Sequence, residues 1–167
     1  MAVLPIRTYP DPVLRVRCSK IESFDSDLRS LAEDMIATMY AAPGVGLAAP
    51  QVGVEKRLAV VDVSVGKEPE ALKVLVNPEI VEAEGREMDT EGCLSIPDLT
   101  EKVARPTTVR VVARDLDGRP LELEAEDFEA RAICHEVDHL NGILFIDHLR
   151  GLRRDRVRRQ LKKLGRR

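Results

Sequence analysis

Two of the three histidines in this chain, His135 and His139, stand four residues apart in the segment His-Glu-Val-Asp-His. On a helix, residues four apart lie one above the other on the same face, so both imidazoles can reach one metal ion. Glu136 is turned off that line but stays close enough to accept a proton from a metal-bound water. The pattern predicts a helix that carries a hydrolytic metal site. The alternative is a chance histidine pair on an ordinary helix.

A catalytic site of this type needs a third protein ligand and an open position for water. In one common arrangement a third histidine follows six residues after His139, but Phe145 stands there. A glutamate on a later helix is not available, because no glutamate follows Glu136 in the sequence. Asp147 and His148 remain as downstream candidates.

Upstream, Cys93 is the favoured third ligand. It follows Gly92, which permits close backbone approach, and its thiolate suits zinc or ferrous iron. Cys134 is a competitor, but it lies about 100° around the helix from the adjacent His135 and should point away. Cys18 is interpreted as a small buried apolar residue, which is also the alternative for Cys93.

The remaining sequence predicts an α+β fold. Asp25 or Ser26 caps a first helix, 126–140 forms the helix with the histidine pair, and Asn141-Gly142 ends it. Segments rich in β-branched residues, together with an extended pair that turns near Glu84-Gly85, predict strands at 57–65, 72–76, 78–88, 107–115, 121–125 and 143–146. Asp117-Gly118 indicates a hairpin. Because the strands come in hairpins, we expect antiparallel sheets packed around a central helix, followed by a C-terminal helix.

The length of 167 residues predicts a single catalytic domain over 1–167. Three cysteines, an odd number without a secretory marker, indicate reduced thiols and a cytoplasmic protein. No segment approaches membrane-spanning length, so no membrane partner is expected. Residues 150–167 carry a net charge of +9, whereas the first 149 carry −12.

A basic terminal helix on an acidic body suggests a polyanionic partner such as nucleic acid. The alternative is a solvated helix whose cations favour its carboxyl end. Five residues are expected on the apolar side of this helix: Leu149, Leu152, Val157, Leu161 and Leu164.

Three short motifs then point to a known family. In order, they are Gly44-Val-Gly-Leu-Ala-Ala-Pro-Gln51, Glu91-Gly-Cys-Leu-Ser95 and His135-Glu-Val-Asp-His139. Together they resemble the bacterial form of peptide deformylase. The segments 9–15 and 142–147 also look like features of that family, so the resemblance covers nearly the whole chain. One departure is Cys134, where the family often has glutamine.

The resemblance implies an enzyme that removes the formyl group from the N-formylmethionine of nascent polypeptides and releases formate. His135, His139 and Cys93 would hold one divalent ion with water in the fourth position. Ferrous iron is expected as the native ion, with zinc, nickel or cobalt as alternatives. Glu136 would take the proton of the water and pass it to the departing amine.

The resemblance also implies donors for the oxyanion, namely the side-chain amide of Gln51 and the backbone N–H of Leu94. Without the family context, Gln51 would be read as an ordinary loop residue. Gly46 is expected against the formyl hydrogen, where it leaves too little room for an acetyl methyl group.

The peptide backbone is expected to add a strand beside Val45 and Gly92. The methionine side chain would enter an apolar pocket lined by Val45, Leu94, Phe128 and Ala132. Asp138 is off the histidine face and is expected to be no ligand.

By analogy with bacterial relatives, the C-terminal helix would dock on the ribosome near the peptide exit and contact ribosomal RNA. Two rival functions remain open at this point. One is a metalloprotease with Cys93, Asp147 or His148 as the third ligand. The other is a noncatalytic ribosome- or RNA-binding protein with a structural metal.

Overall fold

The computed structural model describes residues 1–164. It contains seven strands: β1 (Gly46–Ala48), β2 (Leu58–Val61), β3 (Lys73–Glu84), β4 (Glu87–Cys93), β5 (Ile96–Arg105), β6 (Thr108–Arg114) and β7 (Pro120–Glu126). Its α-helices are α1 (Ser26–Ala41), α2 (Asp127–Leu140) and α3 (Gly151–Leu164). Short 3-10 helices occupy Pro12–Arg15, Ala49–Val52, Pro69–Ala71 and Phe145–His148. None of these described helices is both long and apolar enough to cross a membrane.

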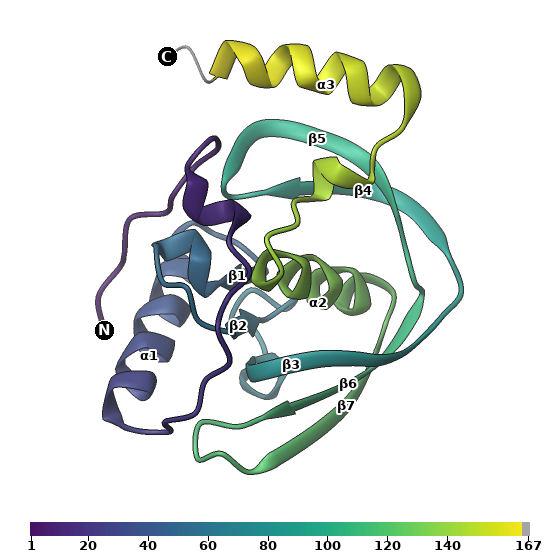
Figure 1. Ribbon diagram of the computed structural model, residues 1–167. Coiled ribbons are helices and arrows are strands. Elements are labelled where there is room, and N and C mark those ends of the chain that lie inside the picture. The colour runs from purple at the N-terminus through teal and green to yellow at the C-terminus, as the bar shows by residue number, and fades with distance from the viewer. Residues whose placement is uncertain (165–167) are drawn as a thin grey trace.

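All strand pairs within the two sheets are antiparallel. A five-stranded sheet has the order β1-β2-β3-β6-β7, and β4 pairs with β5 in a separate two-stranded sheet. Helix α2 lies between these sheets, and α3 runs along the outer side of β5 (Figure 1). The predicted α+β class, with antiparallel sheets around the histidine-bearing helix, is confirmed.

Helix α2 lies at the centre of the fold, and most of its side chains are buried. On the five-stranded sheet, Ile133 and Val137 of α2 share a buried cluster with Val61 and Val111. The helix ends at Leu140, two residues before Gly142, whose φ is +74° and where a Cβ would meet the carbonyl oxygen of Arg15 at 2.5 Å. Only glycine fits both conditions, so the position where the histidine helix stops is fixed by this residue.

Two further apolar clusters hold the other elements. Helix α1 begins at its N-cap Asp25 and packs Met35 and Met39 against β1 and β2. The second cluster joins β5, the 145–148 turn and α3 through Ile96, Phe145 and other apolar residues. Helix α3 is therefore attached to the body rather than projecting free of it.

Four details of the sequence prediction are wrong. The extended pair predicted to turn near Glu84-Gly85 is not a hairpin, because β3 pairs with β2 and β6 whereas β4 pairs with β5. The strand predicted at 57–65 is shorter, since β2 covers only Leu58–Val61. Segment 143–146 is not a strand; Phe145–His148 forms a 3-10 helix, in which the Asp147 carboxylate accepts the N–H of Leu144 at 2.9 Å. Leu152 is 86% exposed instead of lying on the packed side of α3. The predicted burial of Leu164 concerns a side chain outside the described part of the chain.

Candidate metal centre and active-site cleft

Helix α2 brings His135 and His139 together as their spacing predicts. Their Nε2 atoms lie 3.1 Å apart, and both side chains are buried. Burial lowers the pKa of His139, and the neighbouring His135 lowers it further. Two buried imidazole nitrogens that face each other so closely are typical of a shared cation site, since histidine is the commonest metal ligand.

The end of β4 places the third candidate beside this pair. The Cys93 Sγ lies 3.3 Å from Nε2 of His139, and the sulfur and one nitrogen of each histidine all lie within 4.8 Å of one another. Tetrahedral coordination, with bonds of about 2.0–2.1 Å to nitrogen and about 2.3 Å to sulfur, separates ligand atoms by about 3.3–3.6 Å. The donor set and its spacing therefore fit zinc or ferrous iron.

The other candidate ligands lie elsewhere. Asp147 pairs with Arg15 through two hydrogen bonds, at 2.6 and 3.1 Å, and His148 contacts Asp138 at 2.8 Å. Cys134 is buried in the apolar cluster between α2 and the five-stranded sheet, where burial raises its pKa to about 11.

Cys18 is likewise buried in an apolar cluster away from the site, with a pKa of about 11 for the same reason. Neither of these thiols ionises at neutral pH, so neither is poised to bind a cation. Among the three cysteines, only Cys93 reaches the histidine pair.

Glu136 lies in the floor of the same site. Its side chain is buried, and burial raises its pKa to about 7, close to the ideal for a group that both takes and gives a proton near neutral pH. Its Oε1 atom has no hydrogen-bond partner among the described residues. A Cβ at Gly46 would meet Cγ of Glu136 at 3.1 Å and its carboxylate closer still. The glycine on β1 thus makes room for the carboxylate.

Gln51 is no ordinary loop residue in this structure. It is buried, its Oε1 accepts the N–H of Ala48 at 2.9 Å, and its Nε2 donates to Oγ of Ser95 at 3.1 Å. The same Nε2 lies 3.7 Å from Sγ of Cys93. These contacts fix which end of the amide faces the metal site, and it is the donor end.

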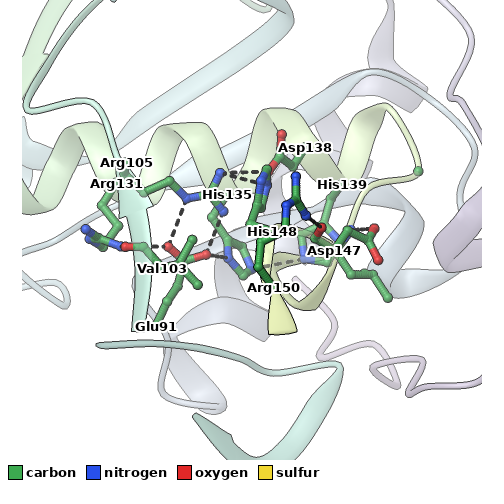
Figure 2. Close-up of polar contacts among 12 residues, drawn as sticks. Glu91, Val103, Arg105, Arg131, His135, Asp138, His139, Asp147, His148 and Arg150 are labelled. Atoms are coloured by element: carbon green, nitrogen blue, oxygen red, sulfur yellow. Dashed lines mark hydrogen bonds and ion pairs between the residues drawn. The ribbon is translucent and has the colours of Figure 1, made fainter. Parts of the chain in front are cut away.

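A buried ionic network supports the site from behind, and the sequence reasoning missed it (Figure 2). Glu91 of β4 contacts Nδ1 of His135 at 2.8 Å through Oε2. Arg105 of β5 donates to both oxygens of Glu91, at 3.0 and 2.6 Å, and Arg131 of α2 donates to Oε1 at 3.1 Å. Arg105 also pairs with Asp138 at 2.7 Å, so the Asp138 carboxylate faces this arginine. This position agrees with the expectation that Asp138 is no metal ligand.

The electrostatic effect of this network falls on His135. Burial alone would raise the pKa of Glu91, but hydrogen bonds from His135 and Arg105 outweigh it and lower the pKa to about 2. Burial would lower the pKa of His135, but Glu136, Cys93 and Glu91 together raise it. An ionised Glu91 keeps a proton on Nδ1, so that the Nε2 lone pair faces the site. Glu91 belongs to a recognised motif, but nothing local in the sequence links it to either arginine.

The candidate site opens into a cleft of about 590 Å³. Every residue expected to bind substrate lines it: Val45, Gly92, Leu94, Phe128 and Ala132. Gly46, Gln51, Cys93, His135 and Glu136 also line it. Phe128 is 53% exposed and so lies at the mouth rather than in the floor.

Comparison with known proteins agrees with this geometry. The family model described as polypeptide deformylase matches residues 3–155. A peptide deformylase from Acidobacterium capsulatum is 48% identical over 99% of this chain and 98% of its own length. One from Azotobacter vinelandii is 52% identical over 98% of this chain and 96% of its own length.

Solved structures show the same likeness. A crystal structure of a peptide deformylase from Legionella pneumophila superposes with a TM-score of 0.91 at 45% identity, covering 99% of this chain and 96% of that one. The enzyme from Thermus thermophilus gives a TM-score of 0.88 at 44% identity, covering 96% of each chain. The ordered motifs, the fold and these relatives lead to one assignment: the chain belongs to the polypeptide deformylase family.

Proposed function

We propose that residues 1–167 act as one catalytic domain that removes the formyl group from the N-formylmethionine of newly made polypeptides and releases formate. As a member of its family the chain is a metal-dependent hydrolase. The observation that carries the assignment of roles is the convergence of Cys93 Sγ with Nε2 of His135 and His139, beside the buried carboxylate of Glu136.

Cys93, His135 and His139 would hold one divalent cation. Ferrous iron is the proposed native ion, and zinc, nickel and cobalt are alternatives that the same donor set accommodates. When bound, such an ion acts as a Lewis acid that makes water a usable nucleophile at neutral pH. Because a thiolate replaces a neutral ligand, the protein donors themselves reduce the charge of the site by one unit.

Glu136 handles the proton. Its carboxylate accepts a proton from the attacking water, whose oxygen forms the new bond to the formyl carbon. The bond between that carbon and the amide nitrogen then breaks, and Glu136 gives the same proton to the departing amine. Formate and a free amino terminus are the products.

The carbonyl oxygen gains negative charge during the attack and needs donors. The Gln51 side chain, held with its amide nitrogen toward the site, and the Leu94 backbone N–H are the proposed donors. Loss of one such donor typically raises the barrier by about 3–4 kcal/mol. Gly46 leaves space for a formyl hydrogen next to Glu136 but too little for an acetyl methyl group.

The peptide is proposed to lie along β1. This strand is at the edge of the five-stranded sheet, so its outer side can pair with an extended chain beside Val45, while Gly92 flanks the other side. Recognition through main-chain groups suits an enzyme that accepts many protein sequences. The methionine side chain would contact Val45, Leu94, Phe128 and Ala132.

The function is tested with a short formyl-methionyl peptide. We expect formate release without cleavage of internal peptide bonds, whereas cleavage of those bonds would indicate a metalloprotease. Glu136→Ala should abolish turnover while the metal content stays unchanged. Turnover that survives in Glu136→Ala would show that Glu136 is not the base. Absence of turnover in the wild type would favour a noncatalytic protein.

We further propose that the enzyme works in the cytoplasm and that α3 contacts the ribosome. The helix is held on the body by buried Val157 and Leu161 and by ion pairs from Arg153 and Arg156 to Glu101. Its other cations are exposed: Arg154, Arg158, Arg159, Lys162 and Lys163. They form a basic surface that suits phosphate groups.

Charge reversal tests this contact better than deletion, since deletion also removes buried side chains. We expect the triple change Arg158→Glu, Arg159→Glu and Lys162→Glu to weaken cosedimentation with ribosomes and leave peptide turnover unchanged. The matched control reverses three exposed cations of the body: Lys20, Lys67 and Arg86. Equal loss of binding in both triple variants would contradict a specific role for α3.

A further inference from the structure

The hairpin that carries Cys93 contains a large irregularity beside the metal site. β4 and β5 pair regularly up to Gly92 and Thr100, but the next pair joins Cys93 to Ile96. Three residues of β5, Pro97, Asp98 and Leu99, therefore have no partner on β4. Bulges next to active sites commonly redirect a side chain, and this one directs Asp98.

The direction of Asp98 is set by its neighbours. Ile96 and Leu99 are buried in the cluster beneath β5, at 1% and 8% exposure, and fix both ends of the irregular segment. Between them, Pro97 and Asp98 are exposed. Asp98 adopts a left-handed backbone with φ of +66°, a conformation that aspartate tolerates better than most residues. Asp98 is exposed and lines the cleft, so its carboxylate belongs to the cleft wall and not to the core.

Asp98 is exposed, whereas the other acidic and basic side chains that line the cleft are buried. Glu91 and Arg131 are buried and paired with each other, and Glu136 is buried in the floor. Asp98 has no ion pair and no side-chain hydrogen bond within residues 1–164. The cleft mouth thus carries one exposed and uncompensated negative charge. The other polar groups nearby, Thr90 and Thr100, are neutral.

A bound substrate must pass this charge. With the formyl group at Glu136, the peptide can leave the cleft only through its mouth, and an extended chain advances about 3.3 Å per residue. Residues 43–45 and Asp98 all line this cleft, so the proposed path of the residues that directly follow the formyl-methionine runs between them. We infer that Asp98 is a specificity-determining residue that favours lysine or arginine close behind the formyl-methionine. The inference rests on the proposed function.

The expected preference is modest because the pair is exposed to water. We expect a substrate with lysine to be used about two- to fivefold better than one with glutamate at the same position, mainly through KM. Added salt should reduce this ratio, since exposed charges are screened. Catalysis at the metal should be little affected, as the charge does not reach the reacting atoms.

The experiment uses formyl-methionyl peptides of equal length, with lysine, glutamine or glutamate at the second, third or fourth position. For each protein, the ratio of kcat/KM for the lysine and glutamate peptides is measured. Such a ratio is independent of the active fraction of each preparation. We expect Asp98→Asn to bring the ratio near one and Asp98→Lys to reverse it. Asparagine is well tolerated at positive φ, so the first variant decides the matter if the second fails to fold.

The control is Glu22→Lys, which changes the net charge as much as Asp98→Lys but lies at an exposed position outside the cleft lining. It should keep the wild-type ratio. A preference that Asp98→Lys leaves unchanged, or that Glu22→Lys reverses equally, would overturn the inference and assign the effect to the acidic body as a whole. Turnover of the glutamine peptide without any charge preference would overturn the inference alone. Failure to turn over any peptide would overturn the proposed function as well.

Discussion

Oε2 of Glu91 lies 2.8 Å from Nδ1 of His135, although the two residues come from a β-hairpin and a helix 44 residues apart in the chain. The contact fixes the tautomer of His135 and aims its other nitrogen at Cys93 and His139. Two buried arginines, Arg105 and Arg131, compensate the charge of Glu91, and Asp138 pairs with Arg105. The metal site is thus attached to both the hairpin and the helix.

We expect Glu91→Gln to weaken metal binding by about 10- to 100-fold, because the neutral amide no longer holds a proton on Nδ1 of His135. Loss of metal to a chelator, followed over time, measures the effect. Glu87→Gln is the matched control, since that side chain is exposed on the same strand. Equal rates of metal loss in the two variants would contradict the role of Glu91.

We expect Gly46→Ala to lower kcat strongly, by about 100-fold, because the new methyl group displaces the Glu136 carboxylate. Gly44→Ala is the comparison on the same segment. There the one contact of a Cβ under 3.0 Å would be with Cδ1 of the flexible Leu94 side chain, at 2.8 Å, so the effect should be milder and fall mainly on KM. Steady-state kinetics at equal metal content separate the two outcomes. A similar kcat in both variants would show that Gly46 does not protect the carboxylate.

We expect Leu161→Ala to lower the free energy of unfolding by about 2–4 kcal/mol, because Leu161 is buried between α3 and the body. Leu152→Ala on the same helix should change it little, since Leu152 is 86% exposed. Urea denaturation of both variants measures the difference. If Leu152→Ala proved as costly as Leu161→Ala, the packing of α3 against the body would have to be revised.

We expect Asp62→Asn to destabilise the fold by about 1–3 kcal/mol near neutral pH. The Asp62 carboxylate is fully buried and accepts bonds from Tyr40 at 2.5 Å, from Ser64 at 2.6 and 2.9 Å, and from Gly66 at 3.0 Å. An amide can accept only some of these bonds and adds donors that face other donors.

The effect of Asp62 should depend on pH. Burial alone would raise its pKa, but the bonds from Ser64, Tyr40 and Gly66 outweigh burial and lower it. A lowered pKa stabilises the folded state above the pKa of the unfolded chain, about 4, and this contribution disappears as the pH falls through the folded value. The stability gap between the wild type and Asp62→Asn should therefore narrow in acid. A gap that is constant over the acid range would contradict this account.

Much of the architecture could be predicted because it follows from local pattern. The spacing of His135 and His139 predicts α2, and Gly118, with φ of +82°, marks the β6–β7 hairpin that Asp117-Gly118 indicates. The ordered motifs likewise indicate the family without any knowledge of the geometry. The third ligand was narrowed to Cys93 by the failure of downstream candidates, and its role stays a prediction.

The sequence prediction was wrong where the local structure depends on residues that are far away in the sequence. Segment 145–148 became a 3-10 helix because Asp147 caps it and pairs with Arg15. Leu152 lies about 140° around α3 from Val157, so only the side with Val157 and Leu161 can face the body. The number of leucines in α3 does not by itself show which side of the helix packs against the body.

The sequence by itself determined the helix with its two imidazoles, the β6–β7 hairpin and the chemistry available to the chain, because these depend on residues a few positions apart. Only the tertiary structure decided that Glu91, Arg105 and Arg131 meet behind His135, and that the β5 bulge turns Asp98 toward the cleft. Such contacts join strands and a helix through burial and charge compensation, and no local pattern encodes which buried charges will become partners.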